Sequence, residues 1–232
     1  MGVSLAGRTL SGSGAADDPQ REAEGANGWA VLLGSFRGLA ADLAWLRVHL
    51  AWERQDEAAV ERWGDLATTL EPTAVSFWLN AARMVAHDFA ESKYAAVVQQ
   101  HGAWETQRRA LFREQANRAL ARLERARAAC GDDPRIWIEM GNIHLHRRDD
   151  LAEAARCYGR AADAAEAPLY ARRIEAGLWW RLGRREKAVA ALRQHHAALL
   201  TAPAGAVDPD LVREVEGRLS QWTRELEQSL NE

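Results

Sequence analysis

Residues that break or cross-link a chain are scarce in this sequence. Its 232 residues include 6 prolines and 2 cysteines, Cys130 and Cys157, and no CxxC spacing. Two cysteines are too few for a disulfide framework, and their spacing does not fit a zinc or redox motif. Because both fall on apolar helical stripes, we expect them to be small buried side chains. Val and Ile rarely cluster, which disfavours strands, and abundant alanine favours helix throughout.

Signatures of a membrane span or an export signal are also missing. The longest apolar run near the N-terminus, Trp29–Phe36, is far too short to cross a bilayer. Residues 1–26 are rich in Gly, Ser, Ala and charged residues and lack the apolar stretch of a signal peptide, so they predict a disordered leader. We therefore expect a soluble, cytoplasmic chain.

Known motifs of catalysis and cofactor binding do not occur. The sequence has no HExxH, GxSxG, GxGxxG or GxxxxGK[ST] motif, and its 7 histidines lack the spacing of a zinc site. Two pairs of adjacent acidic residues, Asp132 with Asp133 and Asp149 with Asp150, precede expected helices, where capping explains them. We expect no enzymatic activity, cofactor or metal. The net charge of −3, from 30 basic and 33 acidic residues, predicts no general attraction to nucleic acid or anionic membranes.

What the sequence does contain is a repeating pair of helices. Three trios of residues have the spacing i, i+4, i+7 at intervals of 35 and 34 residues: Ala119, Leu123 and Ala126; Ala154, Tyr158 and Ala161; Ala188, Leu192 and His195. A helix with a small residue at the expected crossing, Gly141 or Ala176, precedes the second and third trios. Gly183 is suited to the left-handed conformation that ends a helix. Such short units bury their apolar faces only against neighbours.

This pattern resembles the tetratricopeptide repeat, a 34-residue helix–turn–helix unit. Trp137, Gly141, Ala154, Tyr158 and Ala161 match its Trp, Gly, Ala, aromatic and Ala positions. The resemblance implies an all-α fold, a right-handed superhelical array of antiparallel helix pairs, or α-solenoid. We expect the array over residues 27–207, with an expanded second unit over about 72–131. A C-terminal capping helix over 208–232 is expected to bury its apolar face on the last repeat.

Several packing expectations follow from the apolar stripes. A long amphipathic helix is predicted to pair with a second one through two stripes: Leu32, Phe36, Leu39, Leu43, Leu46 and Leu50; Val60, Trp63, Leu66, Ala67 and Leu70. Six tryptophans are expected in the core: Trp45, Trp63, Trp78, Trp137, Trp179 and Trp222. Trp104 and Trp180 are expected to be exposed. A long helix from Trp104 to Ala129 is predicted to carry Arg118, Arg122 and Arg125 on a solvated face.

The resemblance also implies a binding groove lined by the first helix of each unit. The positions that would face a ligand are Arg83, His87, Arg135, Asn142, His146, Tyr170, Arg173, Trp180 and Arg181. These basic, amide and aromatic groups suit a partner protein or peptide, including an acidic one, with Trp180 as an anchor. We therefore expect a non-enzymatic scaffold that binds neither a small-molecule substrate nor nucleic acid.

Other classes of function also fit the sequence. The C-terminal helix carries Val212, Val215, Leu219, Trp222 and Leu226 at near-heptad spacing, so it could pair with a second copy. The arginine-rich second unit could instead bind RNA. The segment GSFRGLAADLAWLRVHLAW is also similar to bacterial repeat proteins that carry a membrane anchor just upstream, which implies a membrane-associated assembly as partner.

Overall fold

All regular secondary structure in the described part of the chain is helical. The computed structural model describes residues 19–101, 105–203 and 205–230, and no strand occurs among them. The elements in order are α1 (Pro19–Glu53), α2 (Glu57–Leu70), α3 (Val75–Arg83), a π-helical segment (Met84–Phe89), α4 (Ala90–His101), α5 (Glu105–Cys130), α6 (Pro134–Arg147), α7 (Leu151–Asp163), α8 (Tyr170–Arg181), α9 (Arg185–Thr201) and α10 (Pro209–Leu230). The all-α prediction is confirmed.

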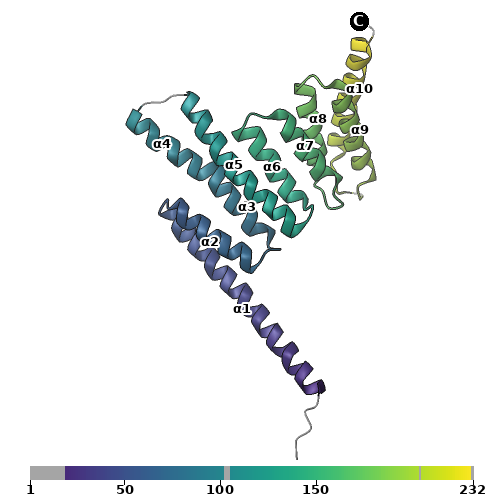
Figure 1. The fold of residues 1–232 in the computed structure, drawn as a ribbon. Coiled ribbons are helices and arrows are strands. Elements are labelled where there is room, and N and C mark those ends of the chain that lie inside the picture. The colour runs from purple at the N-terminus through teal and green to yellow at the C-terminus, as the bar shows by residue number, and fades with distance from the viewer. Residues whose placement is uncertain (1–18, 102–104, 204, 231–232) are drawn as a thin grey trace, which may run out of the picture.

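Helices pack mainly against their neighbours in the chain (Figure 1). The closest pairs are α1 with α2, α6 with α7, and α8 with α9, and α7 joins two of these pairs by packing on α8. The run from α3 through the π-helical segment to α4 packs along α5. The N-terminal half of α1 extends past the end of α2, away from the rest of the chain (Figure 1).

Helix ends form where the capping residues predict them. The Asp133 carboxylate accepts a hydrogen bond from the Arg135 backbone N–H at 2.8 Å, and Pro134 opens α6. Asp150 accepts from the Glu153 N–H at 3.0 Å and caps α7 in the same way. Gly183 has φ +70° just after α8, a conformation that costs a residue with a Cβ about 1–2 kcal/mol. These caps set the short turns between paired helices.

Small residues line the seams where the paired helices meet. Ala154 and Ala161 of α7 are fully buried, and Tyr158 between them is 3% exposed. A Cβ built on Gly141 of α6 would lie 3.0 Å from the Tyr158 ring, so α6 and α7 approach too closely for a larger residue. Trp137 packs beside this seam. The repeated small positions therefore form the contacts that the trios predict.

The packing of α1 differs from the prediction. Its contact face consists of Ala41, Ala44, Val48 and Ala51, which are 0–6% exposed. The predicted stripe instead faces solvent, and its members are 43–65% exposed: Phe36, Leu39, Leu43, Leu46 and Leu50. We call these five side chains the leucine ridge. The prediction that they pack on α2 is wrong, because α1 has a second stripe of small residues that allows closer approach.

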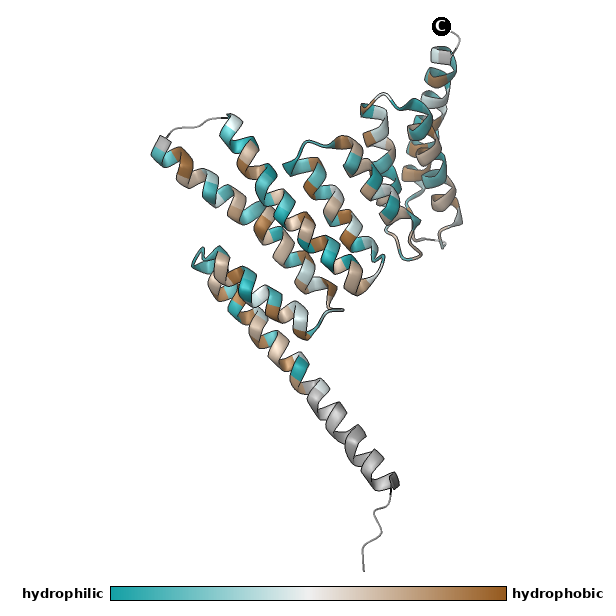
Figure 2. Cartoon of the chain, viewed as in Figure 1, coloured by the Kyte–Doolittle hydropathy of each residue, from teal (hydrophilic) through white to brown (hydrophobic). Residues whose placement is uncertain are grey.

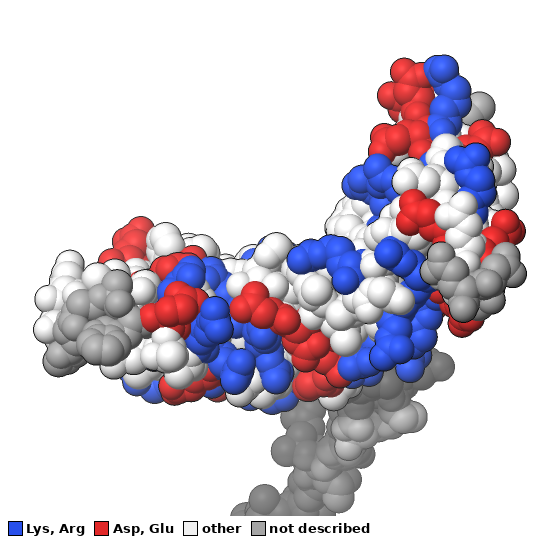
Figure 3. All heavy atoms as spheres, turned by 90° about the horizontal axis from the view of Figure 1, so that it is seen from above, with Lys and Arg blue, Asp and Glu red and all other residues white. Residues whose placement is uncertain are grey.

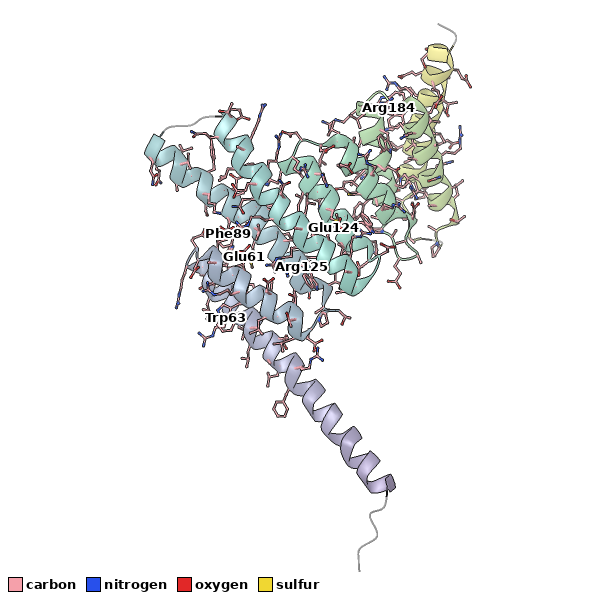
Figure 4. The ribbon with its side chains drawn as sticks, viewed as in Figure 1. Glu61, Trp63, Phe89, Glu124, Arg125 and Arg184 are labelled. Carbon is pink, nitrogen blue, oxygen red and sulfur yellow. The ribbon has the colours of Figure 1, made fainter. Side chains whose placement is uncertain are left out.

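Other features near the N-terminus also differ from the prediction. Trp63 and Leu66 of α2 are 37% and 41% exposed rather than in the core, and Trp63 lies at the outer edge of the α1–α2 pair (Figure 4). Helix α1 begins at Pro19, inside the stretch that the sequence assigns to a leader. Residues 1–18, Trp104 and the Leu32 side chain lie outside the described residues.

The α6–α7 seam leads to a stability prediction for two helical glycines. Gly141→Ala should destabilise the fold by about 1–3 kcal/mol, because the added methyl group must displace a buried ring. Gly177→Ala on α8 should be neutral or stabilise by about 0.5–1 kcal/mol, since no atom lies within 4 Å of the built Cβ. Urea unfolding followed by circular dichroism measures both. Equal effects would contradict the close seam.

Buried histidines predict a second, pH-dependent effect. His195 is 2% exposed, and its pKa is lowered from 6.5 by burial and by the positive charge of Arg173, against the backbone of Leu169. Burial also lowers the pKa of His144, which is 8% exposed. Because the unfolded chain then binds protons more readily than the folded one, stability is full above about pH 6.5 and is lost as the pH falls through the folded pKa.

The thermal midpoint should therefore drop steadily between about pH 7 and pH 5. The change His195→Leu removes one of these groups and should make the drop shallower, whereas the change His146→Leu, at an exposed position, should not. Thermal melts at several pH values provide the measurement. A drop that His195→Leu leaves unchanged would show that this ring does not titrate on unfolding.

Candidate functional site

Three of the predicted groove residues come together, around a carboxylate that the prediction missed. Glu139 of α6 has a side chain only 3% exposed and pairs with Arg83 at 2.8 Å. The Nε2 atom of His87 lies 4.0 Å from the same carboxylate, and the Asn142 side-chain amide donates to it at 3.4 Å. Asn142 in turn accepts a hydrogen bond from the Tyr158 hydroxyl at 2.5 Å. The polar groups of these side chains are therefore paired with one another.

His87 links this cluster to Arg147 at the end of α6. The Arg147 Nε atom donates to His87 Nδ1 at 2.9 Å, which requires a ring nitrogen without a proton. The pKa of His87 is lowered by burial and then by the Arg147 charge, against the effect of Glu139, so the ring is neutral near pH 7. Arg147 also pairs with Glu91 at 2.8 Å, and its side chain is 12% exposed. Its guanidinium is therefore held in one place.

Arg147 forms one wall of a basic cavity between the start of α5 and the end of α6. The cavity has a volume of about 330 Å³. We call it the arginine cavity, and its lining residues are Glu105, Arg108, Arg109, Phe112, Arg113, His146, Arg147, Arg148 and Asp149. Seen from above, Lys and Arg side chains near the α4–α5 end are interspersed with Asp and Glu (Figure 3). Of the predicted groove residues, His146 alone lines it.

A buried phenylalanine places two of the guanidiniums. Phe112 is 6% exposed, and the guanidinium carbons of Arg108 and Arg147 lie 4.8 Å and 4.7 Å from its ring centre. A cation over an aromatic face gains about 0.5–2 kcal/mol. Arg108 is thereby brought to the same ring as Arg147, despite their like charge.

The charges around the cavity do not balance. Glu105 pairs with Arg109 at 2.9 Å and lies 3.9 Å from Arg108. Arg113 and Arg148 make no ion pair with any residue that the structure describes. The cavity therefore presents excess positive charge, with two guanidiniums available to an anionic group.

The other predicted groove residues lie apart from this cluster. The Arg135 side chain folds back onto its own helix cap and pairs with Asp133 at 2.8 Å. Tyr170, Arg173 and Arg181 of α8 are exposed. None of the three lines the arginine cavity.

Trp180, the predicted anchor, is covered from within the chain. Its ring stacks on Trp222 of α10, with centroids 4.2 Å apart and planes 4° from parallel. The Arg185 guanidinium carbon lies 3.6 Å from its centre. The apolar face of α10 packs on α8 and α9 through side chains including Val215, which is 2% exposed. That face is therefore already occupied in a single chain.

The arginine stripe of α5 forms ion pairs with α2 rather than a solvated face. Arg118 pairs with Glu57 at 2.5 Å and with Glu61 at 2.6 Å. Two further arginines share Asp65: the Nη2 atoms of Arg122 and Arg125 lie 3.0 Å and 2.9 Å from its carboxylate. Figure 4 shows Glu61 and Arg125 between the two helices.

The prediction of a solvated arginine face is thus wrong for Arg122, which is 6% exposed. Its pKa is lowered mainly by burial, against the charge of Asp65. With their charge directed at α2, these arginines are poorly placed to contact the phosphates of an RNA.

Other kinds of site find no support among residues 19–101, 105–203 and 205–230. No group of three or more His, Cys, Asp or Glu side chains there could hold a metal ion. No helix in the same stretches combines the length and the apolar character needed to cross a bilayer. The sequence matches no model of a known protein family and no curated protein. Function is therefore inferred from the geometry alone.

Sequence reasoning missed Glu139 and most of the arginine cavity. The adjacent pairs Arg108–Arg109 and Arg147–Arg148 were the available signal. The two arginine pairs line one cavity because the start of α5 lies beside the end of α6. A local sequence pattern does not show that these two segments are neighbours.

The Glu139 cluster predicts a strong effect of a small change. Glu139→Gln should destabilise the fold by about 1–3 kcal/mol, since a buried acceptor of charged hydrogen bonds is lost. Glu124→Gln is the matched control: its carboxylate is 53% exposed and pairs with Arg127 one turn away on α5, so its loss should cost less than about 0.5 kcal/mol. Urea midpoints compare the two variants. A Glu139→Gln variant as stable as the control would show that the cluster contributes little.

Proposed function

We propose that this chain is a non-enzymatic scaffold, built as an array of tetratricopeptide-like helix pairs, that binds an acidic segment of a partner protein. The array is supported by the successive packing of neighbouring helices and by the close Gly141–Tyr158 crossing. The observation that carries the binding proposal is the arginine cavity, with five arginines and His146 against two acidic residues.

A carboxylate-bearing peptide suits this cavity better than an aromatic or apolar ligand. The guanidinium fork matches carboxylate geometry and can form two hydrogen bonds at once. Arg113 and Arg148 are the groups that such carboxylates would contact, because their charges are not taken up by described residues. Phe112 has Arg108 and Arg147 against its ring, so it serves as a support rather than a stacking surface.

Binding of this kind should be electrostatic and sensitive to salt. We expect a fluorescein-labelled hexaglutamate peptide to bind the full chain saturably, with affinity that falls steeply as NaCl is raised. The double variant Arg113→Glu, Arg148→Glu should lose at least about tenfold in affinity. The matched control Arg160→Glu, Arg193→Glu makes the same charge change at exposed positions on α7 and α9 and should stay within about twofold of wild type.

Fluorescence anisotropy at several salt concentrations makes these comparisons. Equal weakening by both double variants would show that net charge, and not the cavity, attracts the peptide. Tighter binding of a single-stranded RNA oligonucleotide than of hexaglutamate, lost in the Arg113→Glu, Arg148→Glu variant, would replace the protein partner with RNA.

A further inference from the structure

The leucine ridge of α1 is a large apolar feature that neither the fold nor the arginine cavity uses. Its five side chains step by 3, 4, 3 and 4 residues along the helix and remain 43–65% exposed. A contiguous row of exposed apolar side chains usually marks a surface that binds a partner. Brown bands along the described part of α1 mark this hydrophobic character (Figure 2).

The ridge faces away from the body of the molecule. The face of α1 that packs on α2 is centred on Ala44 and Val48, and the ridge is centred on Leu43, roughly 140° further round the helix axis. A second helix could therefore lie along the ridge without displacing α2. We infer that its occupant is α1 of a second copy of this chain, paired in parallel as a two-stranded coiled coil.

The spacing fits such a pair. Steps of 3 and 4 place Phe36, Leu43 and Leu50 at the first apolar position of the heptad and Leu39 and Leu46 at the second, where knobs-into-holes packing occurs. Leucine at the second position is the usual choice in parallel two-stranded coiled coils. Helix α1 thus supplies five successive core layers from the described residues.

Charges beside the ridge favour a second copy in the parallel direction. In this register Asp42 and Arg47 flank the core, five residues apart, on opposite sides. In a parallel coiled coil, a residue at the flanking position that Asp42 occupies lies next to the residue five places further along the partner helix. Asp42 of each chain would therefore meet Arg47 of the other, twice in the dimer. Both side chains are exposed and make no ion pair within the described residues.

The length of α1 also favours parallel over antiparallel pairing. Helix α1 has 35 residues and α2 has 14, so the N-terminal half of α1 has no neighbouring helix among the described residues (Figure 1). In proteins, most of the stability of a helix comes from the packing of its apolar face against a neighbour. Parallel pairing sets the two N-terminal halves side by side, whereas antiparallel pairing would direct each one past the end of the partner's α1.

Light scattering coupled to gel filtration tests the inference on the full chain. Wild type is expected to run as a dimer at concentrations on the order of tens of micromolar, and the variant Leu43→Glu, Leu46→Glu as a monomer. Both positions are more than half exposed, so the fold should survive, and circular dichroism confirms it. A monomeric wild type, or a variant that stays dimeric, would overturn the inference, as would wild-type monomers that bind phosphatidylcholine–phosphatidylserine vesicles through the ridge.

Charge variants test the register. Asp42→Arg and Arg47→Asp each place like charges opposite one another and should weaken the dimer at least about tenfold. An equal mixture of the two variants restores opposite charges across the pair and should dimerise as well as wild type. A mixture that stays as weak as either variant would overturn the proposed pairing.

Cross-linking tests the direction. Leu39→Cys should form an intermolecular disulfide on oxidation, because equivalent core positions face each other only in parallel pairs. Ala58→Cys, exposed on α2, is the control for collisional cross-linking, and the parent chain with Cys130 and Cys157 gives the background. Cross-linking of Leu39→Cys no faster than the control would overturn the parallel arrangement. Hexaglutamate binding by the monomeric variant separates this result from the proposed function.

Discussion

Close approach of helices through small residues is the constraint on which this structure depends. Alanine seams bring α1 to α2, and a glycine at position 141 lets α6 reach Tyr158 of α7. Where backbones approach this closely, larger side chains must lie beside the seam or leave it. Trp137 lies beside the α6–α7 seam and helps to fill its core. On α1 Phe36 and the leucines leave the interface and form the leucine ridge, whereas Trp45 and Trp52 pack beside the alanine seam.

The same constraint explains how much of the fold could be predicted from the sequence. The trios around Ala154 and Ala188 are seams, so their period predicted the helix pairs, and the caps at Asp133 and Asp150 predicted where helices begin. The packing of α1 could not be predicted this way. That helix carries an alanine stripe and a leucine stripe, both with helical spacing, and hydrophobicity favours the stripe that the fold leaves exposed.

The candidate site was predictable only to the extent that it lies on one helix face. Arg83, His87 and Asn142 were expected to line one groove, and in the structure they meet around one carboxylate. Their shared partner, Glu139, is buried in the core, and the sequence analysis did not single it out. A single sequence does not show that a carboxylate in the core is satisfied by side chains from another unit, since that depends on packing distances.

The arginine cavity and the leucine ridge occupy different units, and this separation has a consequence for affinity. The cavity lies between the start of α5 and the end of α6, while the ridge lies on the side of α1 opposite its buried alanine face. If α1 pairs with a second copy as proposed, both cavities stay open. A partner with two acidic segments would meet two weak, salt-sensitive contacts on one dimer, and the second contact becomes intramolecular once the first has formed. Modest electrostatic affinity at each cavity can thus yield firm attachment of a partner that spans both.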